Sequence, residues 1–128
     1  KETLKLSTGE HIKATSLFLS KIEKNSLFVG YNDGTIEDGI DEKELSSKSK
    51  LLNKKGVNIW CLAEVSDPQY IVSGDSFGQV IIWNRKSGTA VKVISELQAD
   101  VLTLCSIKDT IFASGIDSKV ISIKLVKD

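Results

Sequence analysis

The sequence YIVSGDSFGQVIIW, residues 70–83, has the pattern of two β-strands joined by a tight turn. Both ends of this stretch are rich in Ile and Val, whose branched side chains favour strands. The glycines and Asp75-Ser76 between them are turn residues and do not resemble a helix cap. With Gly88 supplying the positive φ of a later turn, four strands are predicted. They span about residues 57–65, 69–74, 79–84 and 89–94.

The same arrangement occurs before and after this unit. Residues 27–36 read LFVGYNDGTI, and residues 111–123 read IFASGIDSKVISI. In each copy an apolar tetrad begins 14 residues before a glycine, and these glycines, Gly30, Gly74 and Gly115, are spaced 44 and then 41 residues apart. A period in the low forties with several short strands is typical of the blades of a β-propeller. The chain is therefore predicted to be all-β, with about three four-stranded blades that do not close into a ring.

The predicted units span about residues 12–56, 57–96 and 97–128 of one partial propeller that covers residues 1–128. Residues 1–9 alternate like the outer strand of a preceding blade. Residues 37–56 are rich in Lys, Glu and Ser, so they are predicted to form a polar loop in place of a regular strand. Because a blade cannot bury its faces alone, we expect two open ends. An isolated chain should then be unstable, associate, or need further sequence to complete it.

Composition excludes several classes of protein. Of the 128 residues, 41% are apolar and 27% are charged, as in a globular domain. The 17 basic and 17 acidic side chains cancel, which argues against a strongly basic nucleic-acid-binding surface. No apolar stretch approaches the roughly 20 residues of a membrane-spanning helix. Cys61 and Cys105 lie in predicted strands and are interpreted as buried thiols, with a disulfide between them as the open alternative.

The residue types that enzymes use are scarce. The only histidine, His11, lies far in sequence from both cysteines, so neither an activated nucleophile nor a tetrahedral metal site is predicted. Residues 74–78 lack the Lys and the helix that follow a phosphate-binding loop. The acidic runs at residues 37–38 and 41–44 lie near lysines, and they are interpreted as solvated charges. No catalytic residue, metal, cofactor or small-molecule substrate is predicted.

Binding is the better-supported class of function, because loops on a rigid frame are where binding residues gather. A basic run after residue 47 could contact phosphates, or it only balances the acidic run before it. Phe77 in a turn is a candidate protein contact, and a hairpin tip at residues 85–86 could contact RNA or an acidic partner. Trp60 and Trp83 are predicted to lie in the core, although Trp60 with Tyr31 and Phe77 could instead stack on bases. The candidate binding residues are Lys48, Lys50, Lys54, Lys55, Phe77, Arg85 and Lys86.

These repeats resemble the WD40-repeat family, in which the third strand of a blade ends in Trp followed by Asp. Here the dipeptide is Trp83-Asn84. The family also favours an Asp in the turn between the second and third strands, a place that Asp33 and Asp117 fit and that Phe77 occupies in the middle unit. The resemblance therefore implies that the family's hydrogen-bonded network is incomplete in the middle unit. The implied structural repeat positions are Gly30, Asp33, Gly74, Trp83, Gly115 and Asp117.

A narrower resemblance is to the cirhin family of WD-repeat subunits of the small-subunit processome. It rests on the Ala-Asp-Val-Leu run at residues 99–102 and on the turn Gly115-x-Asp117-x-Lys119, although members of that family carry two complete propellers. It implies a non-catalytic scaffold in the nucleolus, acting in pre-ribosomal RNA transcription and processing. The implied partners are other propeller proteins, with pre-ribosomal RNA as a secondary contact.

Two alternatives stay open at this point. The same repeats could belong to a WD-repeat scaffold elsewhere, such as the substrate-recognition propeller of a ubiquitin ligase. An enzyme built on a propeller is the third class, and the supply of residues argues against it.

Overall fold

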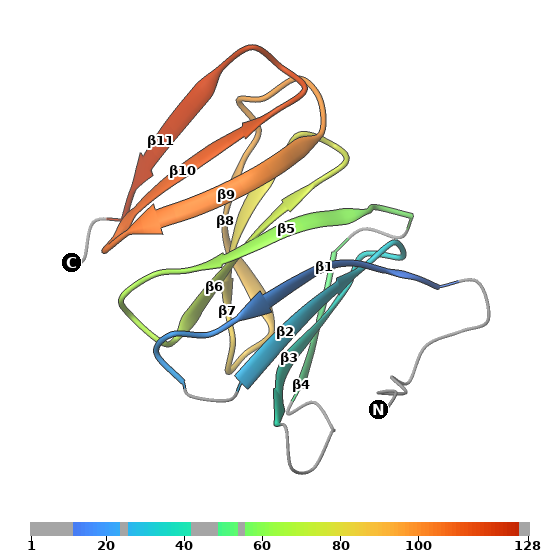
Figure 1. Cartoon of the computed structure of the whole chain (residues 1–128), viewed down its shortest axis with the longest axis vertical. Helices are drawn as coiled ribbons and strands as arrows, with labels where there is room; N and C mark the ends of the chain where they lie inside the picture. Colours follow the sequence, from blue (N-terminus) through green and yellow to red (C-terminus); the bar gives the residue numbers. More distant parts are fainter. Residues whose placement is uncertain (1–11, 24–25, 42–48, 54–55, 126–128) are drawn as a thin grey trace.

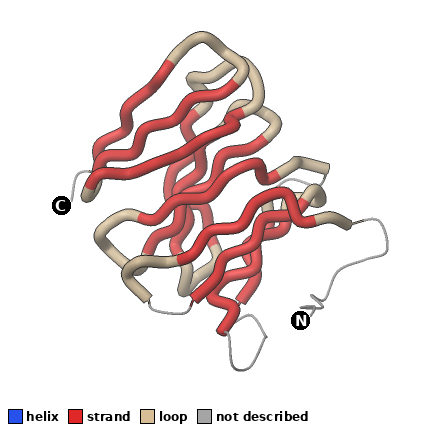
Figure 2. Tube along the Cα trace, in the orientation of Figure 1, coloured by secondary structure: helices blue, strands red, loops and turns tan. Residues whose placement is uncertain are grey.

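The described part of the chain consists of antiparallel β-sheet. The computed structural model describes residues 12–23, 26–41, 49–53 and 56–125, and these residues form eleven strands and no helix (Figures 1 and 2). The strands make three separate antiparallel sheets of four, four and three strands. The all-β prediction is confirmed, and no described segment is a helix long and apolar enough to cross a membrane.

Each sheet is built from strands that are consecutive in the chain. The first sheet, blade 1, contains β1 (Ala14–Leu19), β2 (Ser26–Tyr31), β3 (Thr35–Asp41) and β4 (Ser49–Leu52). Blade 2 contains β5 (Ile59–Glu64), β6 (Tyr70–Asp75), β7 (Val80–Asn84) and β8 (Thr89–Ile94). Blade 3 contains β9 (Val101–Ile107), β10 (Thr110–Gly115) and β11 (Val120–Lys124).

The first strands of the blades, β1, β5 and β9, lie next to one another, and the sheets fan out from them without closing a ring (Figure 1). Blade 2 packs on both neighbours. Ile81 and Trp83 belong to the core shared with blade 1, whereas Val80 and Ile82 belong to the core shared with blade 3. Because successive side chains of a strand point to opposite faces, both faces of β7 are buried. The uninterrupted apolar run that ends at Trp83 follows from this double burial.

Glycines recur where the next blade comes close. A Cβ on Gly30 would lie 2.5 Å from Cγ2 of Ile59 in β5, and a Cβ on Gly74 would lie 2.6 Å from Cγ1 of Val101 in β9. Both distances are far below ordinary van der Waals contact, so the close packing of the blades requires the absence of a side chain here. The glycine spacing that reveals the repeat thus has a physical cause.

The third blade departs from the predicted register by one residue. Gly74 pairs with Cys61 and Val80, and the matching position in blade 3 is Ser114, which pairs with Thr103 and Val120. The predicted equivalence of Gly115 with Gly74 is therefore corrected. Gly115 is required for another reason, because a Cβ at this position would overlap the carbonyl oxygen of Asp100.

The predicted polar loop at residues 37–56 is wrong in part. Its described residues include the end of β3 and all of β4. Ile40 and Leu51 in this range are buried, although the range is rich in polar residues. The irregularity that makes β3 hard to recognise is a bulge opposite Leu27 and Val29, where Gly39 takes a φ of 69°. Residues 42–48 and 54–55, and the strand predicted over residues 1–9, lie outside the described residues.

The outer blades have open faces, as the incomplete ring predicts. Leu17 in blade 1 is 69% exposed, whereas Leu62 at the matching place in blade 2 is 5% exposed because blade 1 covers it. Val120 in blade 3 is likewise exposed, and its counterpart Val80 is buried. Cys105 is exposed and Cys61 is half-buried, so the prediction that both thiols are buried is wrong for Cys105 and holds only in part for Cys61, and both cysteines are free.

Candidate functional site

The two ends of the blades carry different chemistry. The Phe77 end comprises the turns at residues 32–34, 76–79 and 116–119 and the connection at residues 95–100. The Arg85 end comprises the turns at residues 20–23, 65–69, 85–88 and 108–109. Because β1, β5 and β9 run alongside one another, equivalent turns of successive blades gather at the same end (Figure 1).

A buried carboxylate fixes the turn that carries Phe77. Oδ1 of Asp75 accepts hydrogen bonds from the backbone N–H groups of Phe77 at 2.9 Å and Gln79 at 3.1 Å, and Oδ2 accepts one from Nδ2 of Asn53 at 2.9 Å. Phe77 itself is 56% exposed on this rigid turn. Asp75, two residues before Phe77, thus supplies a carboxylate to this turn, and the incomplete family network expected in the middle unit stays a prediction.

The other turns at this end use the predicted aspartates. Oδ1 of Asp33 accepts a hydrogen bond from the backbone N–H of Thr35 at 3.0 Å. Oδ2 of Asp117 accepts one from the backbone N–H of Gln98 at 3.2 Å, which ties the turn of blade 3 to the connection leading into it. Ile116, next to Asp117, is an exposed apolar residue like Phe77. Two neighbouring blades therefore each present an exposed apolar side chain on a braced turn.

The aromatic residues do not form a stacking surface. Tyr31 is buried, and its hydroxyl donates to Oε1 of Glu37 at 2.9 Å. The pKa of Tyr31 is raised above its usual range, first by burial and second by the hydrogen bond to Glu37. Trp60 is half-buried and donates from Nε1 to Asp100 at 2.7 Å, which corrects its placement in the core. Trp83 lies in the core as predicted, with Nε1 donating to Ser73 Oγ at 2.9 Å.

At the opposite end, Arg85 is enclosed by residues from other segments of the chain. Its side chain is 15% exposed, and it forms ion pairs with Glu23 at 2.6 Å and Asp38 at 2.9 Å. NH1 also donates to the carbonyl oxygen of Pro68 at 3.0 Å, and the guanidinium carbon lies 4.9 Å from the ring centroid of Phe28. Burial lowers the pKa of Arg85, but the hydrogen bonds and charges of Glu23 and Asp38 outweigh burial and hold this pKa above its ordinary value. Arg85 is therefore not a free tip residue, contrary to prediction.

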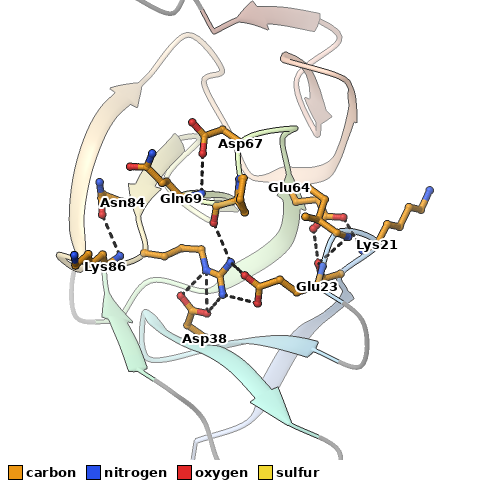
Figure 3. Close-up of polar contacts among 12 residues, drawn as sticks. Lys21, Glu23, Asp38, Glu64, Asp67, Gln69, Asn84 and Lys86 are labelled. Atoms are coloured by element: carbon orange, nitrogen blue, oxygen red, sulfur yellow. Dashed lines mark hydrogen bonds and ion pairs between the residues drawn. The ribbon is translucent and has the colours of Figure 1, made fainter.

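The acidic residues of β3 and β5 are also structural. Glu37 and Asp38 are buried, so their interpretation as solvated charges is wrong. Glu64 at the end of β5 accepts hydrogen bonds from Ser20 Oγ and from the backbone N–H of Lys21, both at 2.7 Å (Figure 3). The loop between β1 and β2 is thus held by blade 2.

The predicted lysines are placed as follows. Lys86 is exposed at the tip of the β7–β8 turn, where its backbone N–H donates to Oδ1 of Asn84 at 3.0 Å. Lys50 is exposed on the edge strand β4. Lys48, Lys54 and Lys55 lie outside the described residues. Among the described residues, no group of three His, Cys, Asp or Glu side chains could hold a metal ion.

No protein-family model matches the sequence, and no curated protein matches it significantly. Solved structures are similar in fold. The WD40 repeats of RRP9 align over 92% of this chain and 37% of their own, with a TM-score of 0.79 and 17% identity. U3-55K aligns over 92% of this chain and 38% of its own, again with a TM-score of 0.79 and 17% identity. A chain of the mitotic checkpoint complex aligns over 91% of this chain and 35% of its own, with a TM-score of 0.80 and 17% identity.

These similarities establish the fold. The chain has the architecture of a WD40-type β-propeller, and it spans a little over a third of the length of these structures.

Proposed function

We propose that this WD40-type propeller segment is a non-catalytic scaffold that docks other proteins through its Phe77 end. The observation that carries the proposal is the pair of exposed apolar side chains, Phe77 and Ile116, on braced turns of neighbouring blades. An aromatic residue held on a rigid turn binds at a low cost in conformational entropy. Such residues are typical anchors of protein interfaces.

The finer proposal is a role in the nucleolar small-subunit processome, in pre-ribosomal RNA transcription and processing. It is supported by the sequence resemblance to the cirhin family. The residues of that resemblance also have defined contacts here, since Asp100 accepts from Trp60 across the blade interface and Asp117 holds the last turn. The zero net charge and the enclosure of Arg85 favour protein partners over RNA. Lys50 and Lys86 are the described candidates for a secondary RNA contact.

The experiment is affinity purification of the full-length protein from its own cells, with protein and RNA both sequenced. The test variant is Phe77→Ser. The matched control is Val91→Ser on β8, because Val91 is also 56% exposed but does not lie at the Phe77 end. We expect the amount of partner protein recovered with Phe77→Ser to fall at least tenfold, and the amount recovered with Val91→Ser to stay unchanged.

The identity of the recovered partners decides the finer proposal. Ribosome-assembly propellers with pre-ribosomal RNA support the processome role, whereas cullin adaptors favour the ubiquitin-ligase alternative. If Phe77→Ser and Val91→Ser retain the same partners, docking through the Phe77 end is refuted.

A further inference from the structure

The interface between blades 1 and 2 has an ionic component that the next interface lacks in the described part of the chain. Between described residues, both ion pairs involve Arg85, which follows β7, and they reach Glu23 and Asp38 in blade 1. Blades 2 and 3 are joined by the apolar cluster around Val72 and Ile111. They are also joined by hydrogen bonds in which a neutral group donates to a carboxylate or a carbonyl, such as the bond from Trp60 to Asp100. The two interfaces therefore differ in kind.

Arg85 is suited to this position by its shape. Nε donates to Oδ1 and Oδ2 of Asp38 at 3.1 and 3.0 Å, while NH2 donates to Oδ1 at 2.9 Å. NH1 and NH2 donate to the two oxygens of Glu23 at 2.6 and 3.1 Å. A planar guanidinium can serve two carboxylates in this way, whereas the ammonium of a lysine is a point charge without a fork.

Asp38 depends on this arginine. It is 2% exposed, and every hydrogen bond to its carboxylate from the described residues comes from Arg85. Removing one partner of a buried ion pair leaves a charge without compensation, which costs far more than the pair contributes when intact. Without Arg85, the Asp38 carboxylate must take up a proton or become hydrated, and either change weakens the contact between blades 1 and 2.

The β1–β2 loop adds a second link to the same clamp. Ser20 Oγ accepts from the backbone N–H of Glu23 at 2.9 Å and donates to Glu64 at 2.7 Å. The loop is thus held by blade 2 at two points, because Glu64 accepts hydrogen bonds from Ser20 and Lys21 (Figure 3) and Arg85 donates to Glu23.

We infer that Arg85 is an interblade clamp that makes blades 1 and 2 open as one unit. Its loss lets blade 1 separate from blade 2 while blade 3 stays docked on blade 2. This inference is independent of the scaffold function, because it concerns residues at the end opposite Phe77.

The experiment is amide hydrogen exchange by mass spectrometry on the full-length protein. The test variants are Arg85→Met and Arg85→Lys. The matched control is Lys86→Met, which removes a neighbouring positive charge from an exposed side chain. In Arg85→Met we expect protection of peptides from β1, β2 and β3 to fall at least tenfold, with β9–β11 unchanged. In Arg85→Lys the protection of these peptides should fall by a smaller factor, and in Lys86→Met it should match that of the wild type.

A second-site variant separates the clamp from a general loss of packing. Adding Asp38→Asn to Arg85→Met removes the uncompensated charge, so it should restore at least a third of the lost protection in blade 1 on a logarithmic scale. The inference is overturned if blade 1 stays within twofold of wild-type protection in Arg85→Met. It is also overturned if β9–β11 lose protection equally, or if Asp38→Asn restores none of it.

Discussion

Gly74→Ala tests the packing that defines the repeat. Gly74 does not have a positive φ, so alanine fits the backbone, and the substitution by itself would stabilise the fold by about 0.4–1 kcal/mol through the unfolded chain. The new methyl group, however, would lie 2.6 Å from both Cys61 Sγ and Val101 Cγ1. The sign of the effect therefore depends on whether these neighbours can yield.

The structure argues that they cannot yield cheaply. Each neighbour must retreat by roughly 0.8 Å to reach ordinary contact at 3.4 Å. Cys61 is paired with Gly74 in the same sheet, and Val101 is fully buried between blades 2 and 3. Overpacking of this kind costs about 1–3 kcal/mol, which exceeds the gain from the unfolded state. We expect a net destabilisation of about 1–2 kcal/mol.

The assay is urea-induced unfolding of the protein, followed by tryptophan fluorescence. The matched control is Ser114→Ala in blade 3, at the same place in the sheet, where a side chain is already accommodated. That variant should stay within about 0.5 kcal/mol of the wild type. A Gly74→Ala protein as stable as the wild type, or more stable, would refute the argument that blade packing requires this glycine.

Two further predictions concern a turn and the thiols. Lys108 has a φ of 55° in the β9–β10 turn, a conformation that costs an L-residue about 1–2 kcal/mol. Because unfolded glycine has greater conformational freedom, part of this cost is offset, and Lys108→Gly should raise the free energy of unfolding in urea by roughly 0.5–1 kcal/mol. A lower urea midpoint would contradict this. Burial raises the pKa of Cys61 to about 12, so at pH 8 its thiol stays protonated. Iodoacetamide should then label the exposed Cys105 in the folded protein and Cys61 only after unfolding, as read by peptide mass spectrometry. Equal labelling of both thiols in the folded state would contradict the raised pKa of the half-buried Cys61.

The candidate site was predicted unevenly from the sequence. Phe77 is exposed in a turn as expected, because glycines and short polar residues around it specify the turn locally. Arg85 has the same kind of local context, at the tip of a hairpin, yet it is enclosed. Its partners Asp38 and Glu23 lie 47 and 62 residues away in the chain, and no pattern among sequence neighbours indicates them.

The sequence by itself determined the repeat and the strands of blade 2. Alternation of apolar residues, turn chemistry and the spacing of Gly30 and Gly74 depend on residues close together in the chain or on a regular period, so they can be read without coordinates. Only the tertiary structure decided which charges are buried and which apolar faces stay open. Glu37 and Asp38 are enclosed because folding brings Tyr31 and Arg85 to them. Burial of a charge depends on what the neighbouring blade supplies as a partner, and that is settled only when the blades pack.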